Sequence, residues 1–255
     1  MILNYDNYGT GGKVVVLLHG MAGSSQYWKP VIPYLTKDCR IIAIDLLGFG
    51  HSPKPKNVNY DYSVHLQSIL ETLDSLGIKG PVTLAGHSMG ALLALRLATV
   101  YPGRIHKLVL IAMPIYSSRQ AAHQAITNCS AVKELAYYGW TSHVLCSTWC
   151  RALRPLSRRL APLYLSTLTK EAARDSVLHT WQSYSQSLHH IIENQTVGQD
   201  LVNATVPTTI LHGDQDKDCL TDSLEPLPKH VTVCTMPGDH QIINTHSKRI
   251  ARYLQ

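Results

Sequence analysis

Six short apolar runs recur along this chain of 255 residues, and most are rich in valine, isoleucine or leucine. They occupy residues 13–20, 40–50, 81–87, 106–113, 207–213 and 230–236. Nearly continuous apolar runs of this length are typical of strands that are buried on both faces of a parallel sheet. Segments with helical patterning separate most of the runs. This alternation predicts an α/β fold with a mainly parallel central sheet flanked by helices.

Signals for individual helices lie between these runs. Residues 63–76 carry apolar side chains at helical spacing, and Gly77 follows as a typical helix stop. Residues 89–100 are apolar almost all round, which predicts a buried helix. Ser24 or Ser25 is a suitable N-cap for a further helix that runs towards Leu35.

The stretch from residue 116 to residue 200 departs from this rhythm. It has no apolar run of the strand type, and helical patterns lie near 118–138, 141–153 and 169–193. Such a length is far beyond an ordinary connection between two strands. We therefore expect residues 116–200 to form a helical cap, or lid, inserted into an α/β core made of residues 1–115 and 201–255.

The pentapeptide GHSMG at residues 86–90 lies between a predicted buried strand and a predicted helix. A serine on a tight strand-to-helix turn needs glycines two residues away on either side, because backbone and helix approach each other closely there. The turn exposes the serine hydroxyl, and the helix N-terminus favours negative charge that develops beside it. Ser88 is therefore the candidate nucleophile, and the alternative is a small polar residue in a buried turn.

A serine nucleophile needs a base, and the base needs an acid that orients it. The sequence LHGDQDKDC at 211–219 offers Asp214, Asp216 and Asp218 just after a predicted strand. The sequence MPGDHQI at 236–242 offers His240 just after the next strand. Functional groups of open α/β sheets gather at the carboxyl ends of the strands. All three loops are predicted to meet at this edge.

Five motifs in the same order resemble those of α/β-hydrolase-fold serine hydrolases of the lid-bearing type, among them carboxylesterases and lactonases. They are LHGMAGSSQYW at 18–28, DLLGFGHS at 45–52, GHSMG at 86–90, LHGDQD at 211–216 and PGDHQ at 237–241. The resemblance covers nearly the whole chain, although residues 116–200 match only in position and helical character. It implies the α/β-hydrolase fold with an inserted helical cap.

The same resemblance implies a role for each motif residue. Ser88 is the nucleophile, His240 the base and Asp216 the acid, while Asp214 or Asp218 remains an alternative to Asp216. The backbone N–H groups of Met21 and Met89 form the oxyanion hole. No cofactor and no metal are needed.

The sequence departs from the family pattern at three places. Ala91 stands where a second glycine often follows the pentapeptide, and the loop after His19 lacks the proline that it often carries. Asp239 directly precedes His240, and a carboxylate there is expected to raise the pKa of the histidine. None of these departures changes the predicted roles.

Several residues near the predicted site are candidates for substrate binding. His19 and His87 are expected to be structural or to line the pocket, with Gly20 and Ile115 beside them. The aromatic residues of the insertion could line an apolar pocket or pack the cap onto the core. These are Trp140, Trp149, Trp181, Tyr137 and Tyr138.

Charge and cysteine usage exclude some classes of function. The net charge is +6, but the densest basic cluster, Arg151, Arg154, Arg158 and Arg159, has no interleaved aromatic stripe. We therefore expect no nucleic-acid binding. The six cysteines include no CxxC pair and no zinc-like spacing, so we interpret them as reduced thiols. The sequence shows no secretory signal pattern and no run long enough to insert stably in a membrane, which favours a cytoplasmic location. We expect a monomer or homodimer that acts on a small-molecule substrate.

The sequence leaves three functions open. The first is hydrolysis of a carboxylic ester or lactone with a short to medium, fairly hydrophobic acyl group. The second is hydrolysis of a carbon–carbon bond in a dienoic keto acid of the meta-cleavage type. Such a carboxylate would need a fixed cation, for which Arg119, Arg151 and Arg154 are candidates. The third is a receptor or regulator with very slow turnover.

Overall fold

The computed structural model describes residues 1–35, 39–127, 139–219, 224 and 226–255. A seven-stranded sheet forms its centre, in the order β1-β3-β2-β4-β5-β6-β7. The strands are β1 (Tyr5–Tyr8), β2 (Lys13–Leu18), β3 (Cys39–Ile44), β4 (Val82–His87), β5 (Ile105–Ile111), β6 (Thr208–Gly213) and β7 (Val231–Met236). Six of them run parallel, and β1 pairs antiparallel with β3 at one edge. The predicted α/β fold is confirmed.

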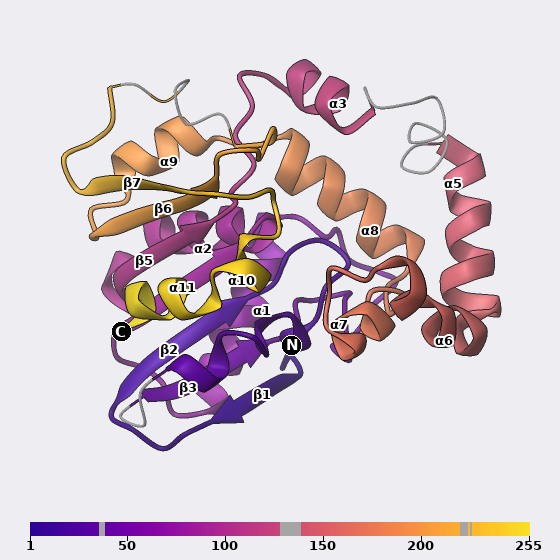
Figure 1. The fold of residues 1–255 in the computed structure, drawn as a ribbon, viewed down its shortest axis with the longest axis horizontal. Helices are drawn as coiled ribbons and strands as arrows, with labels where there is room; N and C mark the ends of the chain where they lie inside the picture. The colour runs from indigo at the N-terminus through magenta and orange to yellow at the C-terminus, as the bar shows by residue number, and fades with distance from the viewer. Residues whose placement is uncertain (36–38, 128–138, 220–223, 225) are drawn as a thin grey trace.

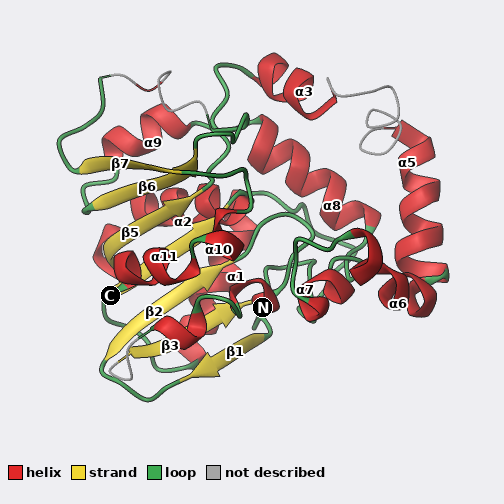
Figure 2. Cartoon of the chain, viewed as in Figure 1, coloured by secondary structure: helices red, strands yellow, loops and turns green. Residues whose placement is uncertain are grey.

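Helices cover both faces of the sheet (Figures 1 and 2). One buried cluster joins the sheet to α1 (Tyr62–Ser75), α2 (Met89–Val100) and α9 (Val197–Asn203). The other joins it to the 3-10 helix η1 (Ser25–Trp28) and to α11 (Ser247–Leu254), with α10 (Ile242–Thr245) beside them. Two further 3-10 helices lie in connections of the core: η2 (Ile32–Tyr34) precedes β3, and η3 (Pro102–Arg104) joins α2 to β5.

The described residues from 119 to 193, between β5 and β6, form a succession of helices that lies beyond the carboxyl ends of the strands (Figure 1). These are α3 (Arg119–Thr127), α5 (Gly139–Cys146), the π-helix η4 (Ser147–Ala152), α6 (Arg154–Tyr164), α7 (Lys170–Asp175), α8 (Trp181–Ser187) and the π-helix η5 (Leu188–Glu193). No helix in the described part of the chain is long and apolar enough to cross a membrane.

One local expectation is wrong, and two observed elements are not among the expected ones. No single helix runs from Ser24 to Leu35, because Pro30 and Pro33 interrupt the stretch and leave two 3-10 turns, although the Ser24 hydroxyl does accept from Gln26 N. Residues 5–8 form the strand β1, which the apolar runs do not predict. Residues 154–164 form the helix α6, with Pro162 inside it, and this helix is not predicted either.

Candidate active site

Ser88 sits on a strained turn between β4 and α2. Its φ of 53° and ψ of −121° lie in a region that non-glycine residues rarely adopt. The Ser88 N–H donates to the carbonyl oxygen of Ile111 at 2.9 Å, which fixes the turn to the end of β5. Ser88 is the N-cap of α2, yet its hydroxyl makes no capping hydrogen bond. The fold therefore holds this side chain in a costly conformation and leaves its oxygen available for another task.

The two glycines that flank the turn are required by close backbone contacts. A Cβ on Gly86 would lie 2.1 Å from the carbonyl oxygen of Gly90, and one on Gly90 would lie 2.4 Å from that of Leu18. Backbone atoms cannot move aside as flexible side chains can. These contacts explain the spacing of the pentapeptide.

We expect Gly90→Ala to lower the free energy of unfolding by about 2 kcal/mol or more, because the new methyl group overlaps two carbonyl oxygens. Gly103→Ala is the matched control, since nothing lies within 4 Å of a Cβ there. The control should change stability by less than about 0.5 kcal/mol in urea unfolding. Equal stability of the two variants would contradict the packing described here.

His240 follows β7 and meets the acid loop that follows β6. Its Nδ1 donates to Asp216 Oδ2 at 2.9 Å, and the carboxylate of Asp216 is almost completely buried. The other oxygen of Asp216 accepts from the backbone N–H of Asp218 at 3.1 Å. With Nδ1 engaged, the neutral ring carries its lone pair on Nε2, which is the arrangement that a general base requires.

The other two acidic residues of the loop have different partners. Asp214 Oδ1 accepts from the backbone N–H of Gly238 at 2.9 Å, so it braces the loop that carries His240. Asp218 Oδ1 accepts from the hydroxyl of Tyr116 at 3.0 Å. Of the three acids that the sequence left open, Asp216 is thus the one that bonds to His240.

The pKa values of this pair shift in opposite directions. Burial acts to raise the pKa of Asp216, but the hydrogen bond and charge of His240 outweigh it, and the pKa is lowered. Burial acts to lower the pKa of His240, but the hydrogen bond and charge of Asp216 raise it more. The charge of Asp239 adds to this rise, as the sequence suggested. The site therefore stabilises the imidazolium that forms when His240 takes up a proton beside the ionised carboxylate.

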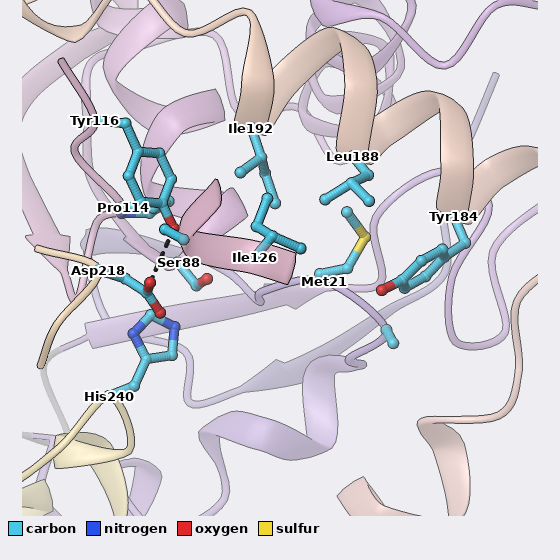
Figure 3. Close-up of a pocket in the computed structure, with 12 residues that line it drawn as sticks. Met21, Ser88, Pro114, Tyr116, Ile126, Tyr184, Leu188, Ile192, Asp218 and His240 are labelled. Carbon is cyan, nitrogen blue, oxygen red and sulfur yellow. Dashed lines mark hydrogen bonds between the residues drawn. The ribbon is translucent and has the colours of Figure 1, made fainter. Parts of the chain in front are cut away.

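A pocket of about 310 Å³, here called the main pocket, contains both Ser88 and His240 (Figure 3). Its remaining walls are mostly apolar and come from the β2–η1 loop, the segment after β5, α3, α8 and η5. The lining residues are Met21, Ala22, Pro114, Tyr116, Ala125, Ile126, Tyr184, Leu188, Ile192 and Asp218. A cavity of this size and polarity suits a small organic ligand.

A second cavity of about 220 Å³, here called the small pocket, reaches Ser88 and His240 from another side. Gly20, Met21 and His87 are among its lining residues. Burial and the nearby charge of His240 lower the pKa of His87 to about 3, so this ring is neutral. His87 Nε2 donates to the carbonyl oxygen of His240 at 3.0 Å, which holds the His240 loop in place.

Two further candidates lie outside both pockets, in buried positions. His19 is a structural residue, because its Nε2 accepts from the N–H of Leu46 and its Nδ1 donates to the carbonyl oxygen of Gly20. Ile115 is only 1% exposed and packs in the core. Ile115 forms an isolated parallel bridge with Cys219, and side chains alternate along an extended backbone. Its neighbours Pro114 and Tyr116 therefore face the main pocket while Ile115 does not.

The three tryptophans proposed for substrate binding lie away from the main pocket. Trp140 on α5 is 76% exposed. Trp149 and Trp181 line a different cavity, of about 350 Å³, here called the aromatic hollow. The apolar character of these side chains predicts that they are buried, but it does not predict which cavity they line. Tyr137 and Tyr138 lie outside the described residues.

Four residues that line the main pocket were not predicted from the sequence: Ile126, Tyr184, Leu188 and Ile192. They belong to helices that are distant from Ser88 in sequence but contribute to the main pocket. Tyr27 was also missed, and its hydroxyl donates to Gln241 Oε1 at 2.8 Å, next to His240. Only helical periodicity could have indicated the first group, and periodicity does not specify which face meets a pocket.

The family model of the alpha/beta hydrolase fold matches residues 13–227. A probable lysophospholipase, BODYGUARD 5 of Arabidopsis thaliana, is 27% identical over 256 residues, covering 90% of this chain and 58% of that protein. A pimeloyl-[acyl-carrier protein] methyl ester esterase of Legionella pneumophila is 39% identical over 111 residues, covering 44% of this chain and 42% of that protein. The chain spans about half the length of the first curated relatives that it matches.

Solved structures agree with this match. A meta-cleavage product hydrolase from Pseudomonas fluorescens superposes with a TM-score of 0.69 at 23% identity, covering 98% of this chain and 91% of that chain. Such a likeness concerns the fold. The strand order, the turn at Ser88 and the family match together support one assignment. The chain belongs to the alpha/beta hydrolase fold family.

Proposed function

We propose that this chain is a serine hydrolase that cleaves carboxylic ester or lactone bonds through an acyl-enzyme. One observation carries the proposal: a serine in a strained turn shares a pocket with a histidine that is hydrogen-bonded to a buried carboxylate. Ser88 attacks the carbonyl carbon and His240 takes the hydroxyl proton. Asp216 fixes the ring and stabilises its charged form. Water then releases the acyl group.

The oxyanion would be bound by the backbone N–H groups of Met21 and Met89. Met89 is the first residue of α2, so its N–H has no acceptor within the helix. Met21 belongs to the loop after β2 and lines both pockets beside Ser88. Donors placed in this way contribute roughly 3 kcal/mol each to stabilisation of the transition state.

Residues 116–200 act as a cap in this proposal. Side chains of α3, α8 and η5 supply the apolar wall opposite Ser88, as Figure 3 shows for Ile126, Tyr184, Leu188 and Ile192. An apolar wall next to the nucleophile suits the acyl chain of an ester. Two relatives, a probable lysophospholipase and a methyl ester esterase, are consistent with ester substrates.

The geometry favours esters over dienoic keto acids. No lysine or arginine is among the described residues that line the main pocket. Arg119 is largely exposed and lies 3.8 Å from Glu193. Arg151 and Arg154 line a different cavity. A fixed cation for a substrate carboxylate therefore lacks support, and a ring-cleavage dienoate is expected to be a poorer substrate than a simple ester.

A series of p-nitrophenyl esters tests the proposed substrate class. We expect kcat/KM to rise about fourfold for each added methylene from acetyl towards medium chains, because each buried methylene contributes about 0.8 kcal/mol. The rise should stop when the main pocket is filled. Lactones and a dienoic keto acid belong in the same panel. A higher kcat/KM on the keto acid than on every ester would contradict the ester assignment. If no compound of the panel is hydrolysed, the result would favour a receptor.

The variant Ile126→Trp tests the position of the acyl chain. We expect it to shift the preferred ester to a shorter chain, because the larger ring fills part of the main pocket. Gln124→Trp is the matched control, since Gln124 lies on the same helix and is exposed. An unchanged chain-length profile in Ile126→Trp, measured as kcat/KM, would place the acyl group elsewhere.

The pH dependence follows from the raised pKa of His240. The base must be neutral, so kcat/KM should rise as pH rises through this pKa, with a midpoint above the ordinary value of 6.5. Asp239→Asn should move the midpoint to lower pH, because the removed charge raises the pKa. Asp74→Asn, on α1 and paired with Arg104, serves as the control. A midpoint below 6.5 in the parent enzyme would be incompatible with the observed ion pair.

A further inference from the structure

A cluster of thiol and imidazole groups lies outside the site of Ser88. It consists of Cys146 at the end of α5, Cys150 in the π-helix η4 and His179 in the loop before α8. One ligand-type atom from each residue lies within 4.8 Å of the other two. Cys150 and His179 are each 8% exposed. Two sulfurs and one ring nitrogen are thus brought together by two segments that are distant in the sequence.

The orientation of His179 leaves one ring nitrogen available to a ligand. Its Nδ1 donates to the backbone carbonyl oxygen of Ser176 at 2.9 Å, which fixes the tautomer that carries the lone pair on Nε2. Histidines that bind metals commonly hold the other ring nitrogen in this way. The ring also contacts the rings of Phe49 and Tyr184, with centroid separations of 6.3 and 5.4 Å, so its orientation is constrained by packing.

The helix that carries the two cysteines has an unusual backbone. Residues Ser147–Ala152, between and around the two thiols, form a π-helix. Such segments are rare and occur frequently at functional sites. A spacing of four residues brings the two sulfurs to one side of the helix, where His179 faces them.

We propose that Cys146, Cys150 and His179 bind one zinc ion. Thiolate and imidazole are the ligands that zinc prefers, whereas calcium and magnesium need oxygen ligands. No aspartate or glutamate is among the described residues that line the two hollows around this cluster. The two thiolates balance the charge of the ion. This site is independent of the proposed esterase reaction.

An ion can reach the cluster from solvent. Cys146, His179 and Trp181 line both the aromatic hollow and an adjoining cavity of about 440 Å³, here called the cationic hollow. Its basic residues are Lys54, Lys56, Arg151 and Arg154. Their charges favour an anion as the fourth ligand, since three protein ligands leave one tetrahedral position open.

Bound zinc would join the segment that ends α5 to the loop that begins α8. These two parts of residues 116–200 also meet in the contact of His143 with Trp181, at 6.0 Å between ring centroids. Tyr184 lines both the aromatic hollow and the main pocket, so an ordered cluster would also stabilise one wall of the main pocket. The ion is therefore expected to stabilise the chain without taking part in ester cleavage.

Metal analysis of the purified chain tests this proposal. The chain is stripped of metals, incubated with Zn²⁺ and freed of unbound ion by gel filtration. Inductively coupled plasma mass spectrometry should then find one zinc per chain. Cys150→Ser and His179→Gln should each weaken zinc affinity by about a hundredfold or more, measured against a chromophoric chelator. Cys234→Ser is the matched control. This half-buried cysteine accepts a hydrogen bond from the Tyr253 hydroxyl and is distant in the sequence from the three proposed ligands. It should retain the zinc.

Two further measurements make the test decisive. Zinc should raise the unfolding temperature of the parent chain and protect two thiols from alkylation, and Cys150→Ser should lose both effects. Each variant should keep its unfolding transition in the absence of zinc, which separates ligand loss from misfolding. The proposal is overturned if the parent chain binds no zinc, if the ligand variants bind it equally well, or if Cys146 and Cys150 are found joined in a disulfide.

Discussion

Replacing Ser88 with alanine is expected to lower kcat for a p-nitrophenyl ester by about 10⁶-fold, the scale on which loss of a serine nucleophile acts. The reason is that the variant retains the pocket and the proposed oxyanion donors but forms no acyl-enzyme. A small residual rate from binding and electrostatics is expected. Steady-state kinetics over a range of ester concentrations measure this effect.

The control for this variant is Ser63→Ala, at an exposed position in the first turn of α1. It should keep full activity, and both variants should unfold at the same urea concentration within about 0.5 kcal/mol. The stability of Ser88→Ala should stay close to that of the parent chain, because alanine keeps the same strained φ of 53° and the Ser88 hydroxyl makes no capping hydrogen bond that the change could remove. Retained activity in Ser88→Ala would remove the nucleophile from the proposal.

Asp216→Asn is expected to lower kcat by about 10⁴-fold, the magnitude known for the same change in a serine-protease triad. The amide NH₂ can donate to His240 Nδ1, which selects the wrong tautomer and takes away the lone pair on Nε2. The loss of charge also removes the interaction that raises the pKa of His240. Ester kinetics at several pH values measure both effects.

Asp214→Asn is the matched control for Asp216→Asn. The two residues share one loop, but Asp214 accepts from Gly238 N, and an asparagine side-chain oxygen can accept the same bond. We expect activity within about tenfold of the parent enzyme. If Asp214→Asn were the more damaging of the two, the acid would be assigned wrongly.

Much of the fold could be predicted because the burial pattern determines it. The apolar runs around Val15, Ile42 and Leu84 form strands buried on both faces, and the observed strands lie within or close to the expected ranges. The edge strand β1 could not be predicted in the same way. Its sequence Tyr-Asp-Asn-Tyr lacks an apolar run, and it is held by pairing with β3, a contact that is formed only in the folded chain.

The residues nearest the chemistry could be predicted because each is tied to local backbone geometry. The turn at Ser88 needs its glycines, and the loops of Asp216 and His240 follow strands that pair with each other. The pocket walls could not be predicted, since they depend on packing between distant helices. Trp149 and Trp181 face the aromatic hollow, and nothing in their local sequence distinguishes that hollow from the main pocket.

The cluster around Cys150 shows the same limit. Cys146 and Cys150 have a spacing that puts both on one helix face, but a pair alone is no metal site. The third group, His179, is distant in sequence and is brought to the pair by the packing of the loop before α8. Only the folded chain makes these three residues neighbours.

The most direct test of the central claim is the site of covalent labelling by a phosphonate ester that reacts with activated serines. The account predicts one adduct per chain in the intact mass, located by peptide mapping at Ser88, with a rate that rises with pH through the pKa of His240. Asp216→Asn should slow the labelling and Ser88→Ala should abolish it. An adduct at another residue, or equal labelling of Ser88→Ala, would contradict the account.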